Sequence, residues 1–153
     1  MNDLPNLEPS RGPFLAMAAF FETVIREDSG VLTLVRMIDR ITISTKHSWI
    51  ASLPPSPIGA NLVVSFRGQD LTGSGVVSIR PRKPSGEDLP KREIPFAYEG
   101  QTGVNLNIEL GMMVDEEGYY WFDIFLNDEL VTRTPLQIVF QQTTATEEED
   151  STG

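Results

Sequence analysis

The sequence predicts an all-β fold, an antiparallel β-sandwich of about seven to nine strands, from the spacing of its apolar residues. Between Gly103 and Leu110 apolar residues occupy every second position, which places one face of a strand in a core and the other in water. Short runs rich in β-branched and aromatic residues recur along the chain, with glycine, proline and aspartate between them. A sheet that is wet on one face favours antiparallel pairing, because parallel sheets are covered on both faces.

The clearest pair of strands lies near the C-terminal end of the sequence. Two apolar and aromatic runs, 118–126 and 129–140, flank the dipeptide Asn127-Asp128. Asparagine and aspartate tolerate positive φ, so the dipeptide predicts a short hairpin turn of a primed type. We expect the upstream segments to supply the partner strands of this hairpin.

Segment 14–27 is ambiguous. Its first half, Ala16 to Ala19, favours a helix, whereas Phe20 to Ile25 favours a strand. We expect a long strand that folds back through Asp28-Ser29-Gly30, and a single helix packed on the sheet is the alternative. The further strands are expected at 31–38, 40–44, 61–67, 76–80, 93–98 and 103–110.

The sequence predicts one domain flanked by two segments without apolar periodicity. A length of 153 residues suits a single domain with a sizeable core. Residues 1–13 carry three prolines and are interpreted as an irregular arm, and residues 14–142 as the sandwich domain. Residues 143–153 contain four consecutive acids that repel one another, so we expect a disordered tail. Inside the domain, the proline-rich stretch 53–59 and the glycine-rich stretch 68–75 are expected to be connections.

The composition excludes several classes of protein. There is no cysteine, so neither a disulfide framework nor a zinc–thiolate site is available. A net charge of −10 repels phosphate, which argues against nucleic acid and anionic membranes as partners. No run approaches the roughly 18 apolar residues of a membrane span. The first residues lack the basic and apolar regions of a signal peptide, and we therefore expect a cytoplasmic location.

One short motif points to a particular kind of sandwich. Glu116-x-Gly118-x-Tyr120-x-Phe122 resembles the sixth strand of immunoglobulin-like domains, in which the tyrosine hydroxyl caps backbone groups at a corner. Phe122 stands where those domains carry a cysteine, and the chain has no partner cysteine. The resemblance therefore implies an immunoglobulin-like antiparallel β-sandwich and excludes a true antibody-type domain.

A wider resemblance covers most of residues 14–140. The run from Gly118 to Glu129, followed by Pro135-Leu136-x-Ile138, resembles the end of proteins in an uncharacterised bacterial family of small single-domain immunoglobulin-like sandwiches. The hydrophobic first strand, the glycine turn and Leu32-Thr33-Leu34 resemble their start. This resemblance implies the fold and a bacterial source, and it brings no catalytic residue to the chain.

The sequence predicts no catalytic site, no metal site and no cofactor. His47 is the only histidine, and it has no nucleophile elbow beside it, so we interpret it as an exposed loop residue. The acids Asp115, Glu116, Glu117 and Asp128 lack the spacing of an EF-hand loop. A whole strand separates Asp115 from Asp128, so these acids are interpreted as solvated turns.

The first strand of the predicted C-terminal hairpin offers a candidate binding surface. If Phe122 points into the core, a period of two turns three aromatic side chains outward: Tyr119, Trp121 and Phe125. Large aromatic groups dominate the energetics of protein interfaces, so this face is predicted to bind another protein or a second copy of the chain. The alternative is that the chain itself covers these residues.

A second candidate surface is a basic stretch in an otherwise acidic chain. Five basic residues lie within thirteen positions, namely Arg80, Arg82, Lys83, Lys91 and Arg92. They are interrupted by Glu87 and Asp88. The functional interpretation is a contact with an anion or an acidic partner, and the alternative is a solvated loop.

Together these features predict a non-catalytic protein-interaction module of the bacterial cytoplasm. Two other classes stay open. One is a structural subunit of a larger assembly, of phage or secretion type. The other is a small hydrolase that uses loop carboxylates, which would need a pair of acids in a deep cleft.

Deletion of residues 143–153 tests the predicted tail. Acids without apolar neighbours cannot offset the entropy lost on ordering, so deletion is expected to leave the Tm within about 1–2 °C, as measured by calorimetry. A fall of about 5 °C or more, equivalent to about 1 kcal/mol in a small domain, would show that the tail packs on the domain.

Overall fold

The computed structural model describes residues 11–45 and 52–142, and every regular element in these ranges is a β-strand. The predicted tail, His47 and most of the predicted N-terminal arm lie outside them. No helix in the described ranges has the length and apolar character needed to cross a membrane. The all-β prediction is confirmed. The strands are β1 (Phe14–Arg26), β2 (Leu32–Ile38), β3 (Arg40–Thr45), β4 (Ser52–Arg82), β5 (Arg92–Glu116), β6 (Gly118–Leu126) and β7 (Glu129–Gln142).

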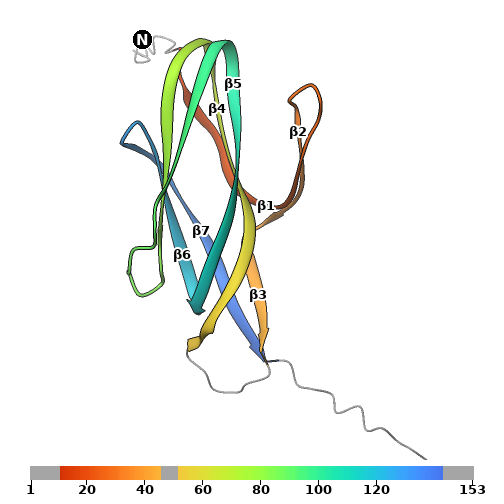
Figure 1. Ribbon diagram of the computed structural model, residues 1–153, viewed down its shortest axis with the longest axis vertical. Helices are drawn as coiled ribbons and strands as arrows, with labels where there is room; N and C mark the ends of the chain where they lie inside the picture. The colour runs from red at the N-terminus through yellow and green to blue at the C-terminus, as the bar shows by residue number, and fades with distance from the viewer. Residues whose placement is uncertain (1–10, 46–51, 143–153) are drawn as a thin grey trace, which may run out of the picture.

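A long hairpin formed by β4 and β5 is the framework of the fold. Its register runs from the pair Ser52↔Glu116 to the pair Ile79↔Arg92. The register shifts between Arg67 and Leu71, and both strands arch over at this end of the molecule (Figure 1). Each strand therefore contributes one half to each of two layers.

The two stretches expected to be connections, 53–59 and 68–75, are part of β4, so that expectation was wrong. Prolines favour extended backbone, which a strand accepts, and Pro57 lies opposite Met113 of β5. In the glycine-rich stretch the strand bends instead of ending, and Asp70 takes a positive φ of 47° there. The two strands expected at 61–67 and 76–80 are consequently the two halves of one bent strand.

The sheet forms two layers that face each other across the core. One layer contains β2, β1, the first half of β4 and the second half of β5. The other contains the remaining halves of β5 and β4, followed by β6, β7 and β3. The ring of Phe20 in β1 packs edge-on against Phe122 in β6, with 4.9 Å between centroids. This contact joins the two layers.

The core side chains come from alternate positions of both layers, as the period of two predicts. Ile108, Tyr120, Phe122 and Ile124 are buried as expected, while Val104 and Leu106 are half-buried against the same core. The buried cluster also includes Phe20, Leu62, Val64, Phe66, Val77, Ile79, Leu110, Leu136 and Ile138.

Segment 14–27 forms a strand, which confirms the first of the two interpretations. β1 lies between β2 and β4 and pairs antiparallel with both. A hydrogen bond from the Gly30 N–H to the Glu27 carbonyl, 2.8 Å long, closes the turn into β2. Pairing on both edges outweighs the helix preference of the alanines, because strand propensity depends strongly on neighbouring strands.

One pair of strands departs from the antiparallel expectation. Only Asp39 separates β2 from β3, and at this residue the chain passes from one layer to the other. β3 then runs parallel to β7, from Arg40↔Gln137 to Thr45↔Gln142. The Gln137 N–H donates a 3.0 Å hydrogen bond to the Asp39 carbonyl at the crossing. Because the chain changes layer at Asp39 without reversing, β3 keeps the direction of β2, and this is also the direction of β7.

The predicted hairpin turn is confirmed. Asn127 and Asp128 have φ values of 48° and 65°, and positive φ at both central residues is what a type I′ turn requires. The Asn127 side-chain oxygen accepts a 2.9 Å hydrogen bond from the Val76 N–H. The Asn127 N–H donates a 3.0 Å bond to the Val76 carbonyl. These two bonds fix the β6–β7 turn to β4.

The tyrosine expected to cap a corner does so. The buried Tyr120 hydroxyl donates to the Glu116 carbonyl at 3.0 Å and accepts from the Glu116 N–H at 3.2 Å. Burial raises the pKa of Tyr120 above its usual value. The hydroxyl thus satisfies two backbone groups where the chain turns from β5 into β6.

Replacing Tyr120 by phenylalanine tests this corner. The substitution leaves both Glu116 backbone groups without their partner, so the free energy of unfolding should fall by about 1–3 kcal/mol in urea denaturation. Tyr119→Phe is the matched control, because Tyr119 is exposed and its change should stay within about 0.5 kcal/mol. Equal losses in the two variants would contradict the structural role of the corner.

Candidate functional site

The outward-facing side of β6 carries the aromatic residues predicted as a binding surface. Tyr119 is 52% exposed and Trp121 43% exposed, whereas the residue that follows each of them, Tyr120 and Phe122 respectively, is buried. Phe125 is half-buried on the same outer side. The alternation that was expected along this strand is therefore present.

Arginines from the two neighbouring strands lie among these aromatic residues. The register places Arg82 of β4 opposite Trp121, and Arg133 of β7 opposite Asp123. The Arg80 guanidinium lies over the Phe125 ring, 3.9 Å from its centroid, in a cation–π contact. We call the surface formed by Tyr119, Trp121, Phe125, Arg80, Arg82 and Arg133 the aromatic–arginine face.

Asp123 anchors two of the arginines. It points to the outer side of β6, yet it is only 6% exposed. One carboxylate oxygen lies 3.4 Å from Nη2 of Arg82, and the other lies 3.2 Å from Nε of Arg133. The contact with Arg82 is also a hydrogen bond, and the contact with Arg133 is an ion pair, so the carboxylate holds one arginine on each side of β6.

The loop between β4 and β5 borders this face and encloses a hollow of about 360 Å³. Asp88 of the loop pairs with Nε of Arg82 at 3.5 Å. The Leu89 N–H donates a 2.9 Å hydrogen bond to the Pro81 carbonyl and keeps the loop against β4. The hollow is lined by Arg80, Pro81, Arg82, Asp88, Leu89, Lys91, Asp123 and Phe125.

The five basic residues of the predicted anion contact do not form one patch. Arg80, Arg82 and Lys91 line the hollow beside the aromatic–arginine face. Lys83 instead lies 3.2 Å from Asp115, and the hydrogen bond with this carboxylate raises the pKa of Lys83 above its usual value. Arg92 donates a hydrogen bond to the Glu109 carbonyl. Arg80, Arg82 and Lys91 thus lie beside the aromatic surface, whereas Lys83 and Arg92 have other partners.

Asp128 lies apart from Asp115, the acid with which it was considered as a metal ligand. Asp115 is in β5 and Asp128 is in the β6–β7 turn, with the whole of β6 between them in sequence. Each faces its own cation, Lys83 for Asp115 and Arg80 for Asp128 at 3.7 Å. Among the residues the structure describes, no group of three or more histidine, aspartate or glutamate side chains could hold a metal ion.

Sequence reasoning missed Asp123 and Arg133 as members of the site. The sequence placed Asp123 on the outward side of β6, and an acid amid three aromatics was the available signal. It could not show that β4 and β7 would bring Arg82 and Arg133 to this acid, because strand pairing across the sheet was not predictable.

Comparisons with known proteins yield a likeness in fold only. No family model matches the chain, and no curated protein matches it. A similar solved structure is an immunoglobulin-like protein from Pseudomonas aeruginosa, with 13% sequence identity and a TM-score of 0.38. The alignment covers 80% of this chain and 91% of that chain. At this TM-score the likeness carries no inference about function.

Replacing Asp123 by asparagine tests the anchor. The change removes the charge that holds Arg82 and Arg133, so the free energy of unfolding should fall by about 1–3 kcal/mol. Asp128→Asn is the matched control, because that carboxylate is 94% exposed and its pair with Arg80 should contribute less than about 1 kcal/mol. Chemical denaturation of both variants measures the free energy of unfolding. An equal loss in the two variants would contradict the role of Asp123 as an anchor.

Proposed function

We propose that this chain is a non-catalytic protein-interaction module that binds its partner through the aromatic–arginine face. The observation that carries the proposal is the exposure of Trp121 and Tyr119 beside arginines held by a buried carboxylate. Tryptophan, tyrosine and arginine are the residues most enriched among those that dominate binding energy at protein interfaces.

The arrangement of the arginines supports binding as well as structure. Arg82 and Arg133 are tied to Asp123, so they lose less side-chain freedom when a partner is bound. Their guanidinium groups still have N–H groups for a carboxylate of the partner. The partner that fits this face is a protein surface with apolar side chains and nearby acids.

A second copy of the chain is one form this partner can take. The net charge of −10 opposes close approach of two copies, although arginines at the contact reduce the repulsion locally. Sedimentation or size-exclusion chromatography at two concentrations separates self-association from binding to another protein.

A structural subunit of a larger assembly is the second candidate, and the edge of β5 favours it. Among the described strands β5 pairs only with β4, which leaves its other edge open over Arg92–Glu116. An open strand edge can pair with a strand of another chain. Glu93, Pro95 and Glu99 lie along this edge, and charges and proline weaken such pairing. The aromatic–arginine face is therefore the stronger candidate.

We further propose that the chain groups with the small bacterial immunoglobulin-like sandwiches that its sequence resembles. Support comes from the motif around Tyr120, whose hydroxyl makes the expected corner, and from the turn at Asn127-Asp128.

Replacing Trp121 by serine tests the proposed function. Trp121 is 43% exposed, so the free energy of unfolding should change by less than about 1 kcal/mol, while binding to the partner weakens by about tenfold or more. The assay compares proteins captured from the source cells by immobilised wild-type and variant chains, together with the concentration dependence of mass.

Met37→Ser is the control, since Met37 is an exposed apolar residue of β2 in the other layer. It should leave capture and mass unchanged. If Trp121→Ser instead lowers stability by about 2–4 kcal/mol, as large-to-small changes in a core do, the chain covers this residue itself and the proposal fails. Unchanged binding in the Trp121 variant would equally rule out this face.

A further inference from the structure

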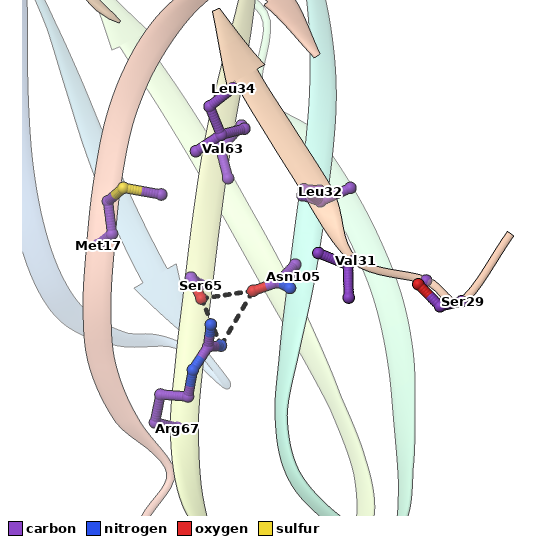
Figure 2. Close-up of a pocket in the computed structure, with 10 residues that line it drawn as sticks. Met17, Ser29, Val31, Leu32, Leu34, Val63, Ser65, Arg67 and Asn105 are labelled. Atoms are coloured by element: carbon purple, nitrogen blue, oxygen red, sulfur yellow. Dashed lines mark hydrogen bonds between the residues drawn. The ribbon is translucent and has the colours of Figure 1, made fainter. Parts of the chain in front are cut away.

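A second hollow lies on the outer side of the other layer, away from the aromatic–arginine face. The β1–β2 hairpin overhangs β4 and β5 there and encloses a groove of about 390 Å³ (Figure 2). Val63, on the outer side of β4, is only 1% exposed although it faces away from the core. The apolar part of the groove is formed by Met17, Val31, Leu32, Leu34 and Val63.

One end of the groove holds a connected polar cluster. The Ser65 hydroxyl donates to the side-chain oxygen of Asn105 at 2.6 Å. Nη1 of Arg67 donates to the same Asn105 oxygen at 2.9 Å and to the Ser65 hydroxyl at 2.6 Å. Figure 2 shows these three side chains meeting below Val63 and Leu34. Ser65 is 2% exposed, so the serine side of this cluster is buried.

The backbone opposite Arg67 allows this arrangement. Arg67 pairs with Gly103 of β5, while Ser65 pairs with Asn105. A Cβ at Gly103 would lie 2.9 Å from both Cδ and Nη1 of Arg67, closer than real side chains approach. Glycine therefore leaves the space in which the arginine folds back toward Ser65 and Asn105.

The guanidinium keeps unused hydrogen-bonding capacity. All of its hydrogen bonds to described residues leave from Nη1, so the Nε and Nη2 N–H groups bond to none of them. Within the described residues no carboxylate lies within ion-pair distance of Arg67. The oxygens that Nη1 contacts are uncharged, so the positive charge at this end of the groove is not neutralised there.

We propose that this groove binds a monocarboxylate that carries an apolar chain. The carboxylate accepts hydrogen bonds from the free N–H groups of Arg67, which suit a planar two-oxygen acceptor. The apolar chain lies along Val63, Leu32 and Leu34. A groove of this volume, lined about equally by apolar and polar groups with the polar ones gathered at one end, suits a small ligand that has both an apolar and a charged part.

The same chemistry has two possible sources. A free carboxylic acid with an aliphatic chain presents it, and so does the C-terminal residue of a peptide whose last side chain is apolar. The shared requirement is a carboxylate next to an apolar group, and separate probes distinguish the two sources.

Octanoate is the first probe, and its binding is followed by NMR titration of the ¹⁵N-labelled full chain. Saturating shifts at Leu34, Val63 and Asn105 are expected, with a Kd below about 1 mM. Octanol has the same chain without the charge and should bind about tenfold more weakly or worse. A peptide ending in a free leucine carboxylate, compared with its amide, then tests the second source.

Two pairs of variants locate the site. Arg67→Gln should lower octanoate affinity about tenfold or more, whereas Arg40→Gln, an exposed arginine of β3 in the other layer, should not change it. Val31 lines the groove but is 56% exposed, so Val31→Asp can place a repelling carboxylate there with little effect on folding. Val31→Asn is its uncharged match and should weaken octanoate binding much less than Val31→Asp does.

The proposal is overturned if neither octanoate nor the free-acid peptide shifts the groove residues at concentrations up to about 10 mM. It is also overturned if Val31→Asp and Val31→Asn bind octanoate equally well. Should Arg67→Gln unfold, which its NMR spectrum would show, the Val31 pair decides. None of these results bears on the aromatic–arginine face, which lies on the other layer.

Discussion

The bent β4–β5 hairpin is the constraint on which the rest of the structure depends. Each of the two strands belongs to both layers. In β4, the apolar residues of the first half, such as Leu62 and Phe66, therefore face those of the second half, such as Ile79, across the core. Where β4 bends, the backbone just before β1 packs closely against it: a Cβ at Gly68 would lie 2.4 Å from the Arg11 carbonyl oxygen. The folded hairpin presents the free edge of β4, on which β1 and β6 pair.

The two outer faces inherit their chemistry from the two halves of β4. The second half contributes Arg80 and Arg82, which β6 meets with aromatic rings and with Asp123. The first half contributes Ser65 and Arg67, over which the β1–β2 hairpin closes a groove. One strand thus supplies cations to two separate surfaces of a chain whose net charge is −10.

The sequence predicted the features that depend on local spacing. The burial of Tyr120 and Phe122, the exposure of Trp121 and the turn at Asn127-Asp128 follow from period-two alternation and from residues that tolerate positive φ. Features that depend on pairing between distant strands were not predictable. Three features arise only when the β4–β5 hairpin folds: β4 continues through its prolines and glycines, β3 pairs parallel with β7, and Arg67 meets Asn105.

The arginines of the two surfaces are held in different ways, and this difference bears on what each can bind. On the aromatic–arginine face a buried carboxylate already offsets part of the charge of Arg82 and Arg133. The contact that we propose there would depend mainly on the aromatic area, with the guanidinium groups setting specificity. In the groove Arg67 meets only uncharged oxygens among the residues the structure describes, and the ligand proposed for this groove would balance its charge. A surface of the first kind suits a broad protein contact, and a site of the second kind suits a single anionic group with an apolar chain.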